Sequence, residues 1–191
     1  MATVTLNGSR LNDAESSTGY ANFVGGGPAP ASEPQLKYQG ANAVNRKVNS
    51  TTDRRGVEYS HGSTTDMTGA SFPLWLCKIK VGDAADLNST YGIEAVIGSA
   101  TSAYYSYNLS GGGANNDQFV DGYNSQGGLA EGYLIVAINP NIAQWREGTT
   151  GSPVLSAVDY FGFGAQFTTG GAKSENVAID SIDVGIGLNF T

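Results

Sequence analysis

The chain has 191 residues, of which 40% are hydrophobic and 10% aromatic, and this is enough for one domain with a substantial core. With 17 acidic and 10 basic residues the formal net charge is −7, which argues against nucleic-acid binding, because contact with phosphates requires a basic surface. One cysteine and one histidine exclude an intrachain disulfide and a structural zinc site built from Cys and His ligands.

Residues 1–13 are predicted to form an N-terminal arm or edge strand, and residues 14–191 a single domain. The first eight residues contain neither the basic nor the apolar region of a secretory signal. No run approaches the roughly 20 apolar residues that span a bilayer. We therefore expect a soluble protein that is made in a cytosol.

The first third of the chain contains short strand candidates separated by turn signals. The stretch 25–34 is rich in glycine and proline, and it predicts a long surface loop. His61 begins a polar stretch that is also predicted to be a loop. The strand candidates in this part are residues 19–24, 35–38, 41–48 and 56–60.

The most apolar run is residues 71–81, which we predict to be a central strand. Its residues Trp75, Cys77, Ile79 and Val81 alternate onto one face, as successive side chains of a strand do. Pro73 lacks an N–H group and should mark the start of the strand. The alternation predicts that Trp75 is buried.

The rest of the chain continues the pattern of short strands. Residues 92–97 and 103–109 predict a hairpin, residues 132–138 a second central strand, and Phe161, Phe163 and Phe167 share one parity that should face the core. In residues 177–188 the apolar parity switches, which predicts a bulge near Asp180 and Ser181. No segment shows sustained helical periodicity. The fold class predicted is all-β, an antiparallel two-sheet sandwich of the jelly-roll type.

No catalytic constellation is evident in the sequence. Nucleophilic catalysis by serine or cysteine needs a histidine base, and His61 is better explained as a loop residue, while Cys77 sits inside a strand. Glycoside hydrolysis needs two carboxylates, yet Glu94 and Glu58 each stand alone in their strand. We predict no catalytic residues and no cofactor, and a glycanase is the least favoured reading.

Calcium is the one metal for which the sequence offers candidate ligands, because calcium binds oxygen atoms. Asp13, Glu15, Asp180 and Asp183 are conceivable ligands, but the EF-hand pattern is absent. Capping of a bulge by these carboxylates is the favoured alternative, and no metal site is predicted.

Sugar binding would use aromatic and amide side chains on one face of a sheet. Tyr105, Tyr107 and Asn108 are the candidate ligand-binding residues, beside Tyr104 on the same strand, and Tyr105 and Tyr107 share a face. The competing interpretation is a tyrosine row that covers a core or a subunit interface.

Two further groups of side chains have candidate roles at interfaces. Trp145 and Arg146 lie in a loop, and residues of these two types dominate the centres of protein interfaces. A basic cluster brackets a polar turn and is predicted to be a solvated loop, with contact to an anionic partner as the alternative. Its members are Arg46, Lys47, Arg54 and Arg55.

The order of several stretches resembles tailed-phage virion structural proteins with a concanavalin-like lectin/glucanase sandwich. The resemblance spans most of the chain from about Ser16. It is carried by residues 16–48, the motifs R-G-V-E-Y-S and F-P-L-W-L, residues 91–107 and the run V-A-I-D-S-I-D-V-G-I-G-L at 177–188.

The resemblance implies a non-enzymatic protein of the virion surface, most simply a capsid decoration or cement protein. Its expected partners are the major capsid protein or tail and fibre components, and further copies of itself. The chain stops at Thr191 directly after the last strand, which favours a stand-alone subunit or a trimmed piece over a whole fibre. The alternative is a carbohydrate-binding fibre or adhesin module that attaches to a host glycan.

Overall fold

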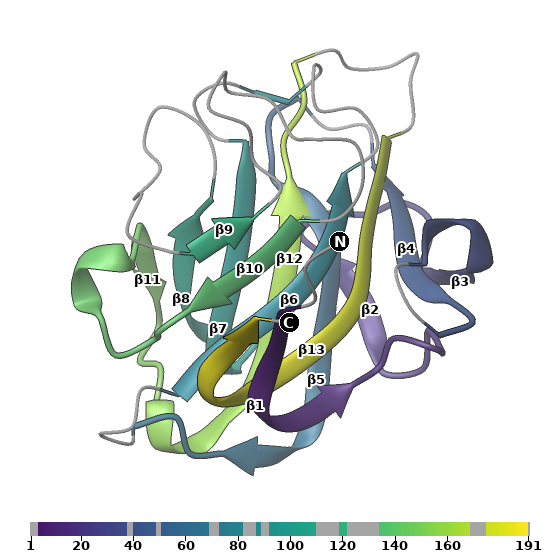
Figure 1. The fold of residues 1–191 in the computed structure, drawn as a ribbon. Helices are drawn as coiled ribbons and strands as arrows, with labels where there is room; N and C mark the ends of the chain where they lie inside the picture. The colour runs from purple at the N-terminus through teal and green to yellow at the C-terminus, as the bar shows by residue number, and fades with distance from the viewer. Residues whose placement is uncertain are drawn as a thin grey trace.

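Two antiparallel β-sheets pack face to face and enclose one hydrophobic core (Figure 1). A computed structural model describes residues 4–37, 40–48, 51–68, 73–81, 87–88, 92–109, 119–121, 134–168 and 175–190. Within these ranges the regular elements are strands and three short 3₁₀-helices: η1 (Pro34–Leu36), η3 (Ala143–Trp145) and η4 (Leu155–Ala157). The predicted all-β sandwich is confirmed.

Among the described residues the first sheet has seven strands, in the order β3-β4-β13-β6-β10-β9, with β1 also paired to β13. The predicted central strand β6 does lie between two partners, β13 and β10, and it begins at Pro73 as expected. The side chains of β6, Trp75 included, fall outside the described residues. The bounds are β1 (Val4–Asn12), β3 (Ala31–Glu33), β4 (Ala43–Val48), β6 (Pro73–Val81), β9 (Phe119–Asp121), β10 (Leu134–Ile138) and β13 (Glu175–Phe190).

The second sheet has six strands within the described ranges, in the order β11-β8-β7-β12-β5-β2. The predicted hairpin corresponds to β7 and β8, which pair in antiparallel register from Glu94 opposite Asn108. The bounds are β2 (Tyr20–Phe23), β5 (Arg55–Thr65), β7 (Ile93–Ala100), β8 (Ala103–Asn108), β11 (Gly148–Thr150) and β12 (Val158–Ala165).

Strand β13 contains the bulge that the parity switch predicts. Ile179 lies opposite Ile79, but Ser181 lies opposite Lys78, so Asp180 is the extra residue on this strand. Because one inserted residue reverses the alternation, Ile179 and Ile182 both reach the core, and both are fully buried.

The N-terminal residues form a strand within this chain. β1 pairs with β13 from Val4 opposite Phe190 to Asn12 opposite Ile182. The Nε atom of Arg10 donates to Oδ1 of Asp183 at 2.9 Å, which links the two strands through their side chains.

The core between the sheets is filled by alternate residues of the strands. Phe161, Phe163 and Phe167 are fully buried there, as their shared parity predicts. Each such aromatic side chain contributes about 1.5–3 kcal/mol relative to exposure. No helix within the described ranges is long and apolar enough to cross a membrane.

Three local predictions were wrong. Residues 31–33, predicted to be loop, form β3 on the edge of β4, and the predicted strand at 35–38 is replaced by η1 over 34–36. Pro34 lacks the N–H group that a strand would use, and the Glu33 side chain accepts from the Gln35 N–H to cap the helix. His61 lies within β5 because the strand continues through the polar stretch to Thr65.

Candidate binding site on the outer face of the six-stranded sheet

Alternation along the six-stranded sheet separates a face packed on the core from an outer face. On β5 and β12 the core-facing residues include Val57 and Phe161, and their neighbours Glu58 and Tyr160 therefore point outward. We call the outward side the outer face. Its described residues include Phe23, Glu58, Glu94, Val96, Tyr104, Tyr160, Gly162 and Gly164.

Two glycines of β12 make room for an aromatic ring on this face. A Cβ atom at Gly162 would lie 2.6 Å from Val96 Cγ2 and 3.0 Å from Phe23 Cδ2, and one at Gly164 would lie 2.8 Å from Phe23 Cδ1. The Phe23 ring therefore lies against bare backbone, and only 2% of Phe23 is exposed. Phe23, Val96 and Tyr160 form a small apolar cluster, separate from the main core.

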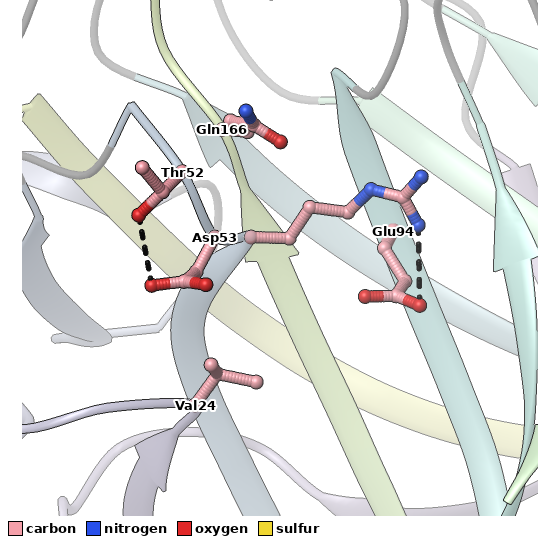
Figure 2. A pocket seen from close by; sticks show the side chains of 6 residues that line it. Val24, Thr52, Asp53, Glu94 and Gln166 are labelled. Carbon is pink, nitrogen blue, oxygen red and sulfur yellow. Dashed lines mark hydrogen bonds and ion pairs between the residues drawn. The ribbon is translucent and has the colours of Figure 1, made fainter.

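A pocket of about 390 Å³ opens beside this cluster (Figure 2). The turn before β5 supplies Thr52, Asp53 and Arg54. Val24 directly follows β2, Glu94 lies near the start of β7, and Gln166 directly follows β12. The lining residues are Val24, Thr52, Asp53, Arg54, Glu94 and Gln166.

Arg54 is held in the pocket by two carboxylates. Its Nη1 and Nη2 atoms donate to Glu147 at 2.5 and 2.6 Å, and Nη1 lies 3.2 Å from Oε1 of Glu94. The Arg54 side chain is 11% exposed and that of Glu94 is 15% exposed. A guanidinium clamped on both edges in this way is a fixed part of the wall.

Burial and pairing set the charges of this network. Burial raises the pKa of the Glu94 carboxyl, and the nearby Arg54 guanidinium opposes that effect without cancelling it. Burial alone would lower the pKa of Arg54, but the hydrogen bonds and charges of Glu147 and Glu94 outweigh it and raise that pKa above its usual value. Arg54 is therefore always charged.

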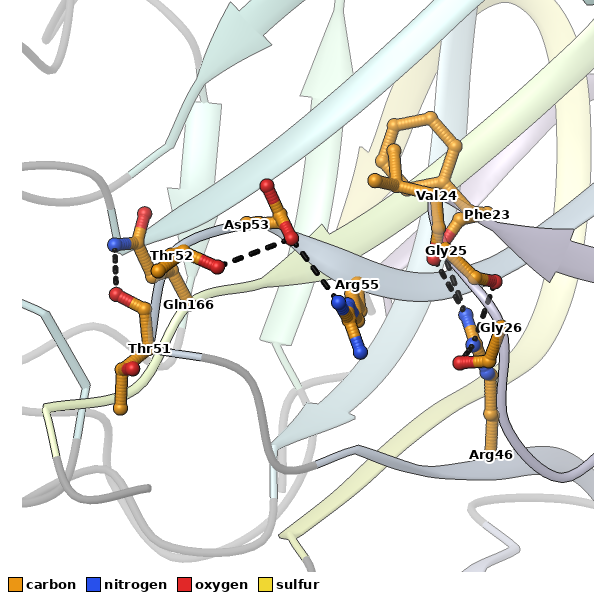
Figure 3. Close-up of polar contacts among 10 residues, drawn as sticks. All are labelled: Phe23, Val24, Gly25, Gly26, Arg46, Thr51, Thr52, Asp53, Arg55 and Gln166. Atoms are coloured by element: carbon orange, nitrogen blue, oxygen red, sulfur yellow. Dashed lines mark hydrogen bonds and ion pairs between the residues drawn. The ribbon is translucent and has the colours of Figure 1, made fainter. Parts of the chain in front are cut away.

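The opposite wall carries smaller polar groups. Thr52 Oγ1 donates to Oδ2 of Asp53 at 3.1 Å, and Arg55 Nη2 donates to the same oxygen at 3.1 Å (Figure 3). Gln166 Nε2 donates to the carbonyl of Thr51 at 2.7 Å. Because its nitrogen is engaged in this way, Gln166 presents its carboxamide oxygen as the acceptor toward the pocket.

The prediction of a solvated basic loop was wrong for two of its members. Arg46 is 1% exposed and donates to backbone carbonyls in the interior, and Arg54 is clamped as described. Lys47 is exposed, as predicted, but it lies in strand β4 and not in a loop. The partner Glu147 lies 93 residues from Arg54, a separation that no local pattern in the sequence reveals.

The structure places Tyr105 and Tyr107 on a different face from Tyr104 and Asn108. Tyr105 and Tyr107 share a face, as expected, but it is the core face: Tyr107 is fully buried, and burial raises its pKa to about 12. Tyr107 therefore fits the competing interpretation of a tyrosine row that covers a core. Tyr104 and Asn108 lie on the outer face, where Asn108 is opposite Glu94 and is 1% exposed.

The two predicted interface residues make contacts within the chain. Trp145 is half-buried against the core. The Arg146 guanidinium carbon lies 3.6 Å from the centroid of the Tyr105 ring, and its Nη2 donates to the carbonyl of Pro140 at 2.7 Å. An interface role for Trp145 and Arg146 stays a prediction.

The conceivable calcium ligands do not form one site. Asp13 accepts from the backbone of Glu15, and the Glu15 carboxylate accepts from the backbone N–H groups of residues 41 and 42. Asp183 is paired with Arg10, and Asp180 is the extra residue of the bulge. In the part of the chain that the structure describes, no group of three or more His, Cys, Asp or Glu side chains is placed to hold a metal ion.

Glu58 and Glu94, each alone in its strand, lie on the same outer face but on strands that β12 separates. Glu58 accepts a hydrogen bond from the Tyr160 hydroxyl at 2.8 Å, two strands away from Glu94. That hydrogen bond and, above all, burial raise the pKa of Tyr160. His61 takes no part in the pocket, and its Nδ1 atom lies 3.4 Å from the Tyr59 hydroxyl.

Comparison with known proteins shows the fold. No protein-family model and no curated protein sequence matches this chain. The chain is similar to the solved family 11 carbohydrate-binding module from Clostridium thermocellum in complex with a β-1,3-1,4-mixed-linked tetrasaccharide, with 13% identity over 95% of this chain and 96% of that one, at a TM-score of 0.53. A second structure, the family 11 module of the cellulosomal cellulase Lic26A-Cel5E of the same organism, gives 12% identity over 96% of both chains, at a TM-score of 0.52. The shared feature is the β-sandwich fold, and both neighbours are carbohydrate-binding modules.

Proposed function

We propose that this chain is a carbohydrate-binding module that holds a neutral glycan in the pocket on its outer face. The observation that carries the proposal is the pocket itself. It has about 390 Å³ of space and is lined by two carboxylates, a guanidinium, a carboxamide and a hydroxyl that other groups of the chain hold in place. This binding role is better supported than the virion decoration role that the resemblance implies.

The chemistry of the lining suits the hydroxyl groups of a sugar. Each hydroxyl both donates and accepts, so a carboxylate such as Asp53 and a carboxamide oxygen such as that of Gln166 accept from it. The clamp on Arg54 and the bond from Gln166 to Thr51 fix these groups before a ligand arrives. Pre-organised groups lose less conformational freedom on binding, which favours affinity.

The charge of the pocket disfavours acidic glycans. Three carboxylates face two guanidinium groups here: Arg54 pairs with Glu94 and Glu147, and Arg55 pairs with Asp53. A ligand with uronate or sulfate groups would add negative charge beside this surplus. A neutral glucan such as the mixed-linked tetrasaccharide bound by the structural neighbour is the first ligand to try.

Binding without turnover fits the state of the carboxylates. Hydrolysis needs one carboxyl group as acid and a second as nucleophile or base. Glu94 and Glu147 both contact the same Arg54 guanidinium, and Glu58 is bonded to the Tyr160 hydroxyl. We infer that these groups serve structure and recognition, so that a bound oligosaccharide is released intact.

The test is a glycan array followed by isothermal titration calorimetry. We expect binding to neutral glucans, weaker binding to acidic polysaccharides and no cleavage of the bound sugar. Asp53→Ala should weaken binding about tenfold, the loss of one good hydrogen bond to a charged group. Asp66→Ala removes an exposed carboxylate that does not line the pocket and is the matched control. Equal affinity in both variants, or no glycan bound at millimolar concentration, would reject the proposal.

A place on a virion is a separate proposal, and it is compatible with glycan binding. The resemblance to phage structural proteins motivates it, and a module that binds a host glycan would serve attachment. Co-purification with phage particles is the measurement. Recovery of the protein only in the soluble fraction of a lysate would count against it.

A further inference from the structure

Val24, in the wall of the pocket, has an unusual backbone conformation. Its φ angle is +53°, in the left-handed region, which a β-branched residue rarely adopts because its side chain crowds the backbone. Val24 is also 40% exposed, and it is one of two large hydrophobic residues classed as exposed in the described ranges. A costly conformation thus places an apolar side chain at the mouth of a polar pocket.

The backbone around Val24 contacts the buried guanidinium of Arg46. Arg46 comes from β4 of the opposite sheet, and its Nη1 lies 2.8 Å from the carbonyl of Phe23 and 3.2 Å from that of Val24. Its Nη2 lies 3.1 Å from the carbonyl of Gly25 and 3.0 Å from that of Gly26 (Figure 3). Four consecutive carbonyls therefore converge on one side chain.

These contacts are firm because the charge has been removed from water. Arg46 is 1% exposed, and burial, followed by repulsion from Arg55, lowers its pKa. The described residues give Arg46 no direct ion pair with a carboxylate, so the carbonyls, with Gly56 as a fifth at 2.8 Å, provide its compensation. A buried cation bound in this way keeps its acceptors in place, since each lost contact leaves a polar group unsatisfied.

We propose that Arg46 is a positioning residue that forces Val24 into the left-handed conformation so that its side chain forms the apolar wall of the glycan site. The C–H groups of one sugar face pack against this wall while the hydroxyl groups bond to the polar lining. This inference rests on the proposed glycan-binding function. If Arg46 only stabilised the fold, it would bind the same carbonyls whichever residue stood at position 24.

Val24→Gly separates the two roles because stability and affinity should move in opposite directions. Glycine adopts a positive φ readily, so the melting temperature should rise by about 2–4 °C as strain is released. Loss of the isopropyl group should weaken binding about five- to tenfold, measured by calorimetry with the mixed-linked β-glucan tetrasaccharide and with cellotetraose. The matched control is Val154→Gly at the other exposed valine, which has φ −118° and lies outside the pocket lining. It should lower the melting temperature or leave it unchanged, and leave affinity unchanged.

A double-mutant cycle tests the part played by Arg46. Arg46→Lys keeps the charge but loses the fork of donors, so it should weaken binding about as much as Val24→Gly. In the Val24→Gly background it should cause little additional loss, because the wall is already missing. If Arg46→Lys does not fold, the single variants at positions 24 and 154 still decide whether the strained Val24 forms the apolar wall.

The outcomes separate this inference from the proposed function. A wild-type protein that binds neither oligosaccharide overturns the ligand role of Val24 together with glycan binding. A wild type that binds, with Val24→Gly binding equally well or melting at a lower temperature, overturns only the role of Val24 and Arg46. Higher stability combined with weaker binding, seen only at position 24, supports it.

Discussion

Replacing Arg54 by methionine should destabilise the protein through the carboxylates that it leaves behind. The substitution removes the partner of Glu94, whose side chain is 15% exposed, and of Glu147, whose side chain is 33% exposed. Breaking a buried ion pair from one side costs about 3–5 kcal/mol, and the partial exposure of Glu147 reduces this cost. We expect a loss of about 2–3 kcal/mol, or about 5–10 °C in melting temperature.

The assay is urea unfolding at pH 7.5 and at pH 5, with Arg55→Met as the neighbouring control. Arg55 pairs with Asp53, whose side chain is 44% exposed, and such surface pairs contribute less than about 1 kcal/mol. The loss in Arg54→Met should shrink at pH 5, because the Glu94 carboxyl, with its raised pKa and no guanidinium beside it, takes up a proton there. Equal losses in the two variants, or a loss that does not depend on pH, would refute the reasoning.

Four other substitutions test the electrostatics of Glu94, the assignment of residues to the two faces, and the packing of Phe23 against β12. Because the pKa of Glu94 is raised in the folded state from its ordinary 4.5, its contribution to stability is fully present below that value and is lost as pH rises through the folded pKa. Wild type should therefore gain stability relative to Glu94→Gln as pH falls from 7 to 4.5, and a constant difference in thermal melts would contradict this. Gln166→Ala should weaken glycan binding, since this side chain lines the pocket, whereas Tyr107→Phe should leave affinity unchanged, since Tyr107 is fully buried on the core face; calorimetry that gives the reverse order would contradict this assignment. Gly162→Val should cost at least about 2 kcal/mol in urea unfolding, because even a Cβ would lie 2.6 Å from Val96, and a neutral result would mean that Phe23 is easily displaced.

Local sequence pattern predicts the features of this fold that depend on neighbours along the chain. The place of β6 between two partners follows from its apolar length, and the bulge at Asp180 follows from the switch of parity between Ile179 and Ile182. Both work because the period of a strand is two, so that one inserted residue reverses every later side chain.

Alternation alone does not say which face of a strand is buried. In β8 both parities carry tyrosine, so Tyr105 and Tyr107 were correctly grouped together while their direction stayed open. The pairing of β8 between β7 and β11 and the packing of the opposite sheet decide it, and both depend on residues far away in sequence.

The candidate site was the part least accessible to prediction. Arg46 and Arg54 were predicted to be solvated loop residues. Their acceptors could not be predicted, because they are the carbonyls of residues 23–26 and a glutamate 93 positions away. One signal was present in the sequence: Glu94 is a charged residue within the otherwise apolar strand β7. A charge within such a strand is usually paired, and the pairing residue is what only the structure supplies.

The most direct test of the account is a titration of the isotopically labelled protein with a neutral β-glucan tetrasaccharide, followed by amide chemical shifts in NMR spectra. Glycan binding at the outer face predicts that the largest saturable shifts fall on Val24, Asp53, Arg54, Glu94 and Gln166. An absence of shifts at millimolar sugar, or shifts confined to the seven-stranded sheet, would contradict it.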